Sequence, residues 1–217
     1  MITNPSADAS NRPAKTLRLG ALISGGGRTI LNILRLSRQG TLPITPAVVV
    51  ASRQCGGIDI CRGEGLDVRL VPYKQMPSLE EYSARITAIL DEARVDLVIL
   101  AGFLSPYLIP PRYLGKVMNI HPALLPSFGG HGMYGHHVHE TVLSRGCKVS
   151  GCTVHFVTNE YDCGPIIVQK AVPVLEGDTP DTLAGRVFEQ ELIAYPEAIG
   201  LYAQGRLKID GPVVRVT

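Results

Sequence analysis

Three side chains near the middle of the chain could together run an acyl transfer without a metal. Asn119 and His121 lie two residues apart in the run Asn-Ile-His-Pro, and Asp162 follows about forty residues later in Asp-Cys-Gly-Pro. An asparagine amide can donate hydrogen bonds to an oxyanion, a histidine moves protons near neutral pH, and a carboxylate can fix that histidine's tautomer or accept a proton. The short motif is equally compatible with a buried histidine beside a turn, so its interpretation depends on the elements around it.

The apolar pattern predicts an α/β fold that places these residues at one edge of a sheet. Apolar strands alternate with helical stretches, which indicates parallel pairing with helices on both faces. We expect a single domain with a Rossmann-like, mixed but mostly parallel sheet, in which ligands bind beyond the carboxyl ends of the strands. An expected strand over 116–121 carries Asn119 and His121 to that edge if it runs parallel to its neighbours. The other strands are expected at 17–23, 46–52, 67–71 and 95–101, and helices at 30–36, 57–64 and 78–93.

The last third of the chain has a different pattern. Residues 149–158 alternate between apolar and polar, residues 166–174 form another extended run, and Gly164-Pro165 between them favours a turn. We therefore expect a hairpin that makes the sheet mixed. A helix is expected over 181–203, with a break or kink at Pro196, because proline cannot donate the helical hydrogen bond.

The domain is expected to cover residues 17–208. A chain of 217 residues suits one core of this size. Residues 1–16 are polar and rich in turn formers, which predicts a disordered N-terminal tail, and residues 209–217 are expected to form a C-terminal tail.

Composition and charge exclude several classes of protein. The formal net charge of +2 is far from the clustered basic surface that nucleic-acid binding requires, so a small anionic substrate is a better match. The longest apolar runs are far shorter than the roughly 20 residues of a membrane-spanning helix. The five cysteines include no Cys-x-x-Cys pair, and we interpret them as reduced thiols of a soluble, cytoplasmic protein.

The segment Ser24–Thr29 is a candidate phosphate site. It lies between an expected strand and an expected helix, so the backbone around Gly26, Gly27, Arg28 and Thr29 can present N–H groups to an anion at the helix N-terminus. The sequence matches neither a P-loop nor a complete Gly-x-Gly-x-x-Gly dinucleotide motif. A merely tight turn is the alternative interpretation.

Two further groups of histidines leave alternatives open. Most of the chain's six histidines lie in the glycine-rich segment 128–140, which lacks the His-Glu-x-x-His spacing of a zinc site. We predict an active-site loop there, without a bound metal. His155 alternates with Thr153 and Val157 on one face of an expected strand, where it is either packed within the sheet or part of the site.

Several segments in a fixed order resemble the phosphoribosylglycinamide formyltransferase family over roughly residues 17–208. Each is short, but their combination and order are specific. They are Ser24-Gly25-Gly26-Gly27, Ala101-Gly102-Phe103-Leu104, Asn119-Ile120-His121-Pro122, Val154-His155-Phe156-Val157, Asp162-Cys163-Gly164-Pro165 and Glu191-Leu192-Ile193-Ala194-Tyr195-Pro196.

The resemblance implies a reaction and a set of site residues. The family transfers the formyl group of 10-formyltetrahydrofolate, a co-substrate, to the amino group of glycinamide ribonucleotide in purine biosynthesis. It implies small-molecule partners only, no metal, and a monomer or a homodimer. By this resemblance the catalytic residues are Asn119, His121 and Asp162, the phosphate site is Gly26, Gly27, Arg28 and Thr29, Glu191 binds the substrate, and Phe103, Leu104 and Val157 bind the folate.

The chain departs from the family pattern at three places, one of which is the unusually Gly/His-rich loop over 127–139. Ser105-Pro106 follows Phe103-Leu104 where arginine is common in relatives, and Arg28-Thr29 stands where Ser-Asn is common. Arg28 either contacts the phosphate or points to solvent. A formyltetrahydrofolate hydrolase, a formyltransferase acting on initiator methionyl-tRNA and a phosphate-binding module without catalysis are the alternative functions.

Overall fold

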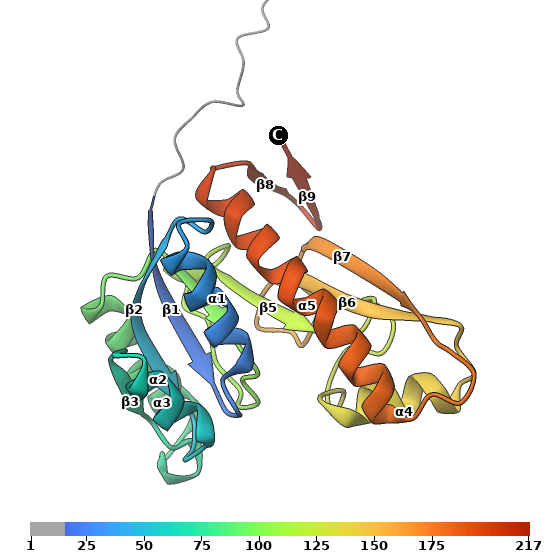
Figure 1. Cartoon of the computed structure of the whole chain (residues 1–217). Helices are drawn as coiled ribbons and strands as arrows, with labels where there is room; N and C mark the ends of the chain where they lie inside the picture. The colour runs from blue at the N-terminus through green and yellow to red at the C-terminus, as the bar shows by residue number, and fades with distance from the viewer. Residues whose placement is uncertain (1–15) are drawn as a thin grey trace, which may run out of the picture.

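The computed structural model describes residues 16–217, and Figure 1 shows their arrangement. The N-terminal tail expected at 1–16 lies, apart from its last residue, outside the described residues. The described chain forms one sheet of nine strands. In spatial order these are β3 (Val68–Leu70), β2 (Ile44–Ala51), β1 (Leu17–Ile23), β4 (Leu97–Leu100), β5 (Val117–His121), β6 (Val149–Phe156), β7 (Ile166–Pro173), β9 (Val213–Val216) and β8 (Leu207–Asp210).

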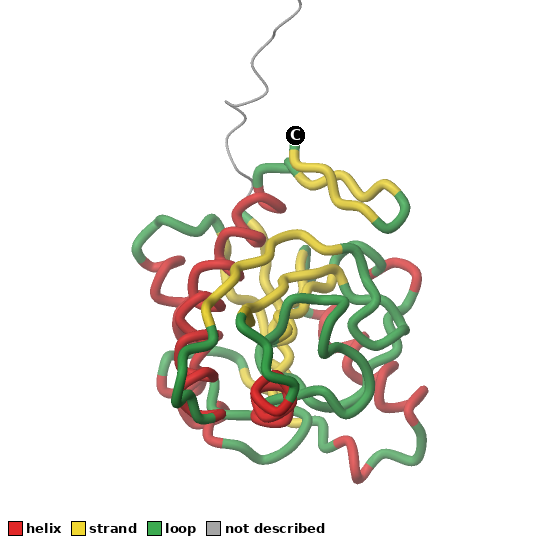
Figure 2. The backbone as a smooth tube through the Cα atoms, turned by 90° about the vertical axis from the view of Figure 1, so that its right-hand side faces the viewer, coloured by secondary structure: helices red, strands yellow, loops and turns green. Residues whose placement is uncertain are grey.

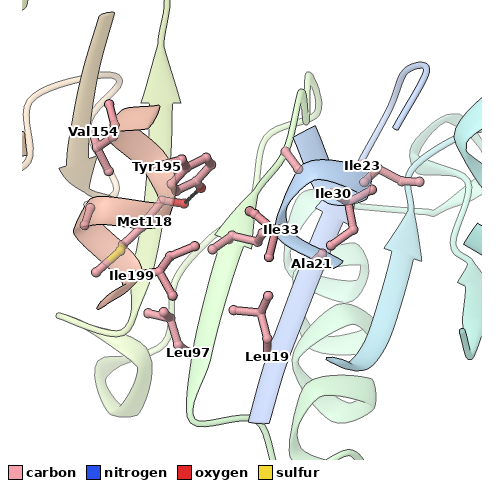
Figure 3. Packing of buried hydrophobic residues seen from close by; sticks show 14 of the residues in the cluster. Leu19, Ala21, Ile23, Ile30, Ile33, Leu97, Met118, Val154, Tyr195 and Ile199 are labelled. Carbon is pink, nitrogen blue, oxygen red and sulfur yellow. Dashed lines mark hydrogen bonds between the residues drawn. The ribbon is translucent and has the colours of Figure 1, made fainter. Parts of the chain in front are cut away.

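Helices cover both faces of this sheet, as the sequence predicts. The α-helices are α1 (Arg28–Arg38), α2 (Gly56–Gly63), α3 (Leu79–Glu92), α4 (His136–Ser144) and α5 (Pro180–Ala203), and the short 3₁₀ helices are η2 (Tyr73–Gln75) and η3 (Pro111–Tyr113). Alternation along the strands explains the two layers, because successive side chains point to opposite faces. Leu19 and Ala21 of β1 pack in one core with Ile33 of α1, whereas Leu22 packs in the other core with Tyr82 of α3. Figure 3 shows the first of these cores, where α1 and α5 meet the sheet.

The order of the strands creates a crevice at one edge of the sheet. β1 is paired with β2 on one side and with β4 on the other, and all three strands run parallel. β5 continues the parallel set beyond β4. The chain therefore reverses its direction of winding between β1 and β4, and ligands bind parallel sheets at such a point, beyond the carboxyl ends of the strands.

The predicted hairpin is confirmed. β6 runs antiparallel to both β5 and β7, so the sheet is mixed. The C-terminal end differs from the expectation, since most of the tail expected at 209–217 is a second hairpin of β8 and β9, and β9 pairs with β7. Figure 2 shows this hairpin beside the C-terminus. The fold therefore extends past residue 208.

Of the two outcomes predicted at Pro196, a break or a kink, the structure excludes the break. α5 continues through Pro196 to Ala203. Proline lacks the N–H that would bond to the carbonyl of Leu192, four residues earlier. The side-chain amide of Asn32 on α1 donates a hydrogen bond to that carbonyl at 2.9 Å. A neighbouring helix therefore supplies the donor that proline removes.

Tyr195 ties α5 to the two strands that border the crevice. Its side chain is fully buried, and its hydroxyl lies 2.8 Å from the carbonyl oxygen of Met118 on β5 and 3.1 Å from that of Leu100 on β4. The single O–H hydrogen is shared between these two acceptors. Figure 3 shows the ring of Tyr195 pointing from α5 toward the sheet.

We expect Tyr195→Phe to lower the free energy of unfolding by about 1–2 kcal/mol, because two buried carbonyls lose their shared donor. Urea denaturation followed by circular dichroism measures this change. Tyr202→Phe on the same helix is the matched control, since the Tyr202 hydroxyl makes no hydrogen bond to a described residue. Equal effects of the two substitutions would contradict a structural role for the Tyr195 hydroxyl.

Among residues 16–217, no helix is both long enough and apolar enough to cross a membrane.

Candidate active site

A cavity of about 580 Å³ opens at the carboxyl edge of β1, β4 and β5. The loop after each of these strands contributes to its wall, and the loop after β6 and one face of α5 complete it. Every residue that the sequence predicts for the site lines this cavity. They are Gly26, Gly27, Arg28, Thr29, Phe103, Leu104, Asn119, His121, Val157, Asp162 and Glu191. The sequence therefore identified the segments that meet at the cavity. The role of each residue stays a prediction.

Asn119 and His121 enter the cavity from the end of β5. They are two residues apart on a strand, so their side chains lie on the same face of the sheet. β5 is held between β4 and β6, with Asn119 opposite His155 and His121 opposite Thr153. Pairing on both sides fixes the backbone beneath the two side chains.

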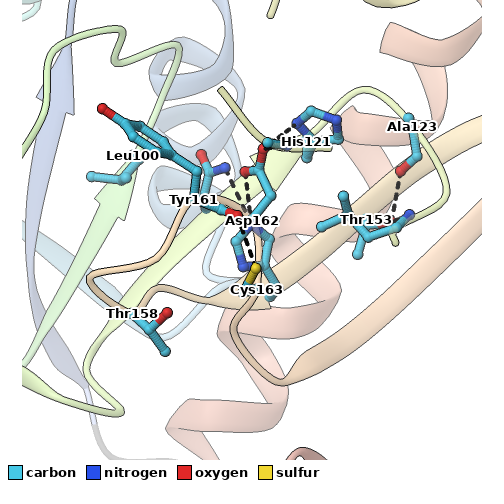
Figure 4. Close-up of polar contacts among 12 residues, drawn as sticks. Leu100, His121, Ala123, Thr153, Thr158, Tyr161, Asp162 and Cys163 are labelled. Atoms are coloured by element: carbon cyan, nitrogen blue, oxygen red, sulfur yellow. Dashed lines mark hydrogen bonds and ion pairs between the residues drawn. The ribbon is translucent and has the colours of Figure 1, made fainter. Parts of the chain in front are cut away.

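Asp162 reaches the same place from the loop after β6, and Figure 4 shows its carboxylate turned toward His121. Oδ2 of Asp162 lies 3.6 Å from Nδ1 of His121, and Oδ1 lies 3.7 Å from Nε2 of His155. The backbone N–H of Gly130 donates to Oδ2 at 2.9 Å. Asp162 has a φ of 55°, a left-handed conformation that aspartate tolerates better than most residues. The predicted meeting of amide, imidazole and carboxylate is therefore present.

The hydrogen bonds of His121 define where a proton can be held. Nε2 lies 2.8 Å from the carbonyl oxygen of Phe128, which can only accept, so Nε2 carries a hydrogen. In the neutral ring Nδ1 is then bare and faces the carboxylate of Asp162. A proton bound at Nδ1 would face this carboxylate, 3.6 Å away.

His155 is connected to Asn119. Nδ1 of His155 donates to the carbonyl oxygen of Phe156 at 2.9 Å, so in the neutral ring Nε2 accepts from Nδ2 of Asn119 at 3.2 Å. Burial lowers the pKa of His155, which favours this neutral ring. The contact fixes the orientation of the Asn119 amide. Its second N–H and its oxygen have no hydrogen-bond partner among the described residues.

The glycine-rich loop before α4, which the sequence could not assign in detail, supports the catalytic candidates through its backbone. The carbonyl of Phe128 accepts from His121, and the N–H of Gly130 donates to Asp162. Gly129 lies between them, and a Cβ atom built there would come within 3.2 Å of Cβ of Asp162. The same Cβ would lie only 2.5 Å from Cδ2 of Leu125, so a side chain at position 129 would have to displace Leu125, Asp162 or both.

Two histidines at the start of α4 each lie near a carboxylate. Nδ1 of His136 lies 3.4 Å from a carboxylate oxygen of Asp181, and Nδ1 of His137 lies 3.2 Å from one of Glu140. Within residues 16–217, no cluster of three or more His, Cys, Asp or Glu side chains is arranged to hold a metal ion.

The candidate phosphate loop joins the end of β1 to the N-terminus of α1. Gly27 has a φ of 76° and begins the helix, which has no acidic residue in its first turn. Gly57 of α2 donates its N–H to the carbonyl of Gly25 at 3.0 Å, and the backbone N–H of Leu104 donates to Oγ of Ser24 at 2.9 Å. The loop is therefore held from two sides, with the positive end of α1 toward the cavity.

Glu191 lines the cavity from α5. Burial raises the pKa of Glu191 to about 7, and the positive charge of Arg28 opposes that shift. The raised value means that folding favours the protonated carboxyl. The protonated Glu191 carboxyl contributes fully to the free energy of unfolding below its ordinary pKa of about 4.5. This contribution is lost as the pH rises through about 7.

We therefore expect the wild-type protein to lose on the order of 2 kcal/mol of unfolding free energy, relative to Glu191→Gln, between about pH 5 and about pH 8. Glutamine cannot ionise, so the variant lacks this pH dependence. Urea denaturation of both proteins at a series of pH values measures the difference. Parallel stability curves of the two proteins across this range would show that folding does not raise the pKa of Glu191.

Sequence reasoning missed several residues of the wall. Phe188 lies one helical turn before Glu191, and this spacing of three residues was the available signal. Tyr134 and His139 belong to the segment 128–140, which the sequence predicted as an active-site loop without assigning its individual residues. Burial lowers the pKa of His139 to about 4, so its ring is neutral.

Comparisons with known proteins agree with this site. Residues 17–199 match the family model described as formyl transferase. The chain is 37% identical over 93% of its length to the chloroplastic phosphoribosylglycinamide formyltransferase of Arabidopsis thaliana, covering 70% of that protein. It is 34% identical over 89% of its length to phosphoribosylglycinamide formyltransferase of Escherichia coli strain K12, covering 90% of that protein.

A solved structure gives the same result. The crystal structure of glycinamide ribonucleotide transformylase 1 from Symbiobacterium toebii matches with a TM-score of 0.85 and 42% identity, covering 93% of this chain and 94% of that one. Sequence, fold and the arrangement of the cavity thus agree. The chain belongs to the formyl transferase family, among its phosphoribosylglycinamide formyltransferases.

Proposed function

We propose that this protein transfers the formyl group of 10-formyltetrahydrofolate to the amino group of glycinamide ribonucleotide in purine biosynthesis. The observation that carries the proposal is the convergence of Asn119, His121 and Asp162 at one cavity that also includes a glycine loop. Family membership supports it, since relatives with the same fold carry the name of this activity.

The catalytic steps need no redox chemistry. The amine nitrogen attacks the formyl carbon, a new C–N bond forms, and the carbonyl oxygen becomes an oxyanion. The free N–H of Asn119 donates a hydrogen bond to this oxyanion. The pair of His121 and Asp162 accepts the proton that the amine loses. The bond from carbon to the folate nitrogen then breaks, and that nitrogen takes up the proton that the pair of His121 and Asp162 accepted.

Binding is divided along the cavity. We place the phosphate at Gly26, Gly27, Arg28 and Thr29, where helix N–H groups can bind an anion. Glu191 is assigned to the glycinamide end, which must lie near Asp162. The folate ring is assigned to Phe103, Leu104 and Val157, whose apolar side chains also line the cavity.

An assay with purified protein tests the function. The protein is mixed with 10-formyltetrahydrofolate and glycinamide ribonucleotide, and absorbance follows the release of tetrahydrofolate. Turnover that requires the ribonucleotide is the expected result. Release of tetrahydrofolate at the same rate without the ribonucleotide would instead identify a formyltetrahydrofolate hydrolase.

We further propose a cytoplasmic enzyme that uses only small-molecule partners and no metal, as a monomer or a homodimer. All five cysteines are free thiols, which supports a reducing compartment. Light scattering of the purified protein would decide between the two oligomeric states.

A further inference from the structure

The guanidinium group of Arg28 rests on an aromatic ring at the cavity wall. Cζ of Arg28 lies 4.1 Å from the centroid of the Phe188 ring. Arg28 is the first residue of α1 and Phe188 belongs to α5, so the contact joins two helices across the entrance to the phosphate loop. The Arg28 side chain makes no hydrogen bond or ion pair with any described residue. Its N–H donors are therefore available to a ligand.

Placing a cation here works against the stability of α1. The N-terminus of a helix carries a partial positive charge, and an added cation there is unfavourable. No acidic residue in the first turn compensates it. The carboxyl group of Glu191 on α5 interacts electrostatically with Arg28, and its pKa of about 7 leaves it only partly ionised near neutral pH. The cation at the start of α1 is therefore one that a bound anion would neutralise.

The ring of Phe188 gives this cation a fixed position. A guanidinium stacked flat on a ring keeps its N–H edge free, and that edge matches the oxygens of a phosphate in a bidentate contact. An exposed arginine without such a platform would lose more side-chain entropy on binding. Phe188 cannot bind a phosphate by itself, because its side chain has no hydrogen-bond donor.

We propose that Phe188 is a positioning residue that holds Arg28 in place for the substrate phosphate, and that the pair makes the site selective for the phosphorylated ribonucleotide. The proposal rests on the proposed function, because it takes the phosphate site as the place where glycinamide ribonucleotide binds. Of the two alternatives for Arg28, the proposal selects contact with the phosphate over an orientation toward solvent.

A double-mutant cycle tests the proposal with Arg28→Ala, Phe188→Leu and the combined variant. We expect Arg28→Ala to raise the KM for glycinamide ribonucleotide on the order of 10–100-fold, and Phe188→Leu on the order of 3–30-fold. Because Phe188 acts through Arg28, adding Phe188→Leu to Arg28→Ala should cause little further change. Phe188→Tyr keeps the aromatic face and should retain a KM near that of the wild type.

Two controls isolate the phosphate. The KM for 10-formyltetrahydrofolate should stay within about 3-fold of the wild type in every variant, since the folate lies elsewhere in the cavity. Calorimetry with ribose 5-phosphate as the probe should show weaker binding to Arg28→Ala and to Phe188→Leu than to the wild type, in the same order as the KM values. The affinity for ribose alone should not differ between these proteins. Circular dichroism and thermal melting confirm that the variants fold.

The outcomes separate this inference from the proposed function. A wild-type KM in Phe188→Leu, or an equal effect of Phe188→Leu with and without Arg28, would overturn the inference while the turnover assay still supports the function. If the wild type shows no transfer but its ribose 5-phosphate affinity depends on Arg28 and Phe188, the proposed function fails and the positioning role stands.

Discussion

Asn119→Ala is expected to lower kcat by about 100–1000-fold, equivalent to about 3–4 kcal/mol of transition-state stabilisation. The amide of Asn119 is fixed by His155 and directs its remaining hydrogen-bonding groups to the cavity. Because a fixed donor needs no reorganisation as the oxyanion forms, its loss affects the transition state more than the bound substrates. Steady-state kinetics should therefore show both KM values within about 3-fold of the wild type.

An effect of Asn119→Ala on KM, with little change in kcat, would contradict this role. If Asn119→Ala mainly raised the KM for one substrate, the amide would serve binding, and another group would have to stabilise the oxyanion. Asn119→Asp gives a second comparison, since it keeps the shape but replaces the donor with a carboxylate that would repel the oxyanion. We expect it to be at least as impaired as Asn119→Ala.

Asp162→Asn is expected to lower kcat by about 100–10,000-fold, because an amide cannot take up the proton that the attacking amine loses. The fold should survive, since the side-chain oxygen of asparagine can still accept from the N–H of Gly130, and asparagine also tolerates the φ of 55°. Single-turnover kinetics with saturating substrates would isolate the chemical step from product release.

Asp181→Asn is the matched control for this variant. Asp181 is exposed at the start of α5, and its described ionic contact is with the exposed His136. It should retain wild-type turnover. Near wild-type turnover of Asp162→Asn as well would remove the Asp162 carboxylate from the mechanism, whereas unfolding of that variant would be visible in its circular dichroism spectrum.

The order and type of most elements could be predicted because their apolar patterns are long and regular. The parallel strands and α3 agree with the expected ranges within a few residues, and Ser78 caps α3 as its position suggests. The C-terminal hairpin was missed because its strands have four residues each, too few for a periodic signal. The turn signal Asp210-Gly211 was the available indication.

The continuity of α5 could not be predicted from local sequence. A proline in a helix normally leaves one carbonyl without a donor, and the sequence of α5 contains nothing that would replace it. The replacement comes from Asn32, 160 residues before the carbonyl that it binds. Only tertiary structure brings the two together.

The candidate site was predictable as a set of residues but not as a network. Residue types made Asn119, His121 and Asp162 candidates, and the resemblance to the family assigned them to the site. Neither could show that His155 fixes the amide of Asn119, because this depends on which ring nitrogen bonds to the carbonyl of Phe156. Such hydrogen bonds follow from the register between β5 and β6, which a single sequence does not specify.

The loop that supports His121 and Asp162 does so with main-chain atoms, at Phe128 and Gly130. Peptide groups persist whatever side chain is attached, so many replacements at position 128 would keep the acceptor. Inserting or deleting one residue between 128 and 130 would instead shift both groups at once. Over evolutionary time position 128 should therefore vary more readily than the length of this stretch or its glycines at 129 and 130.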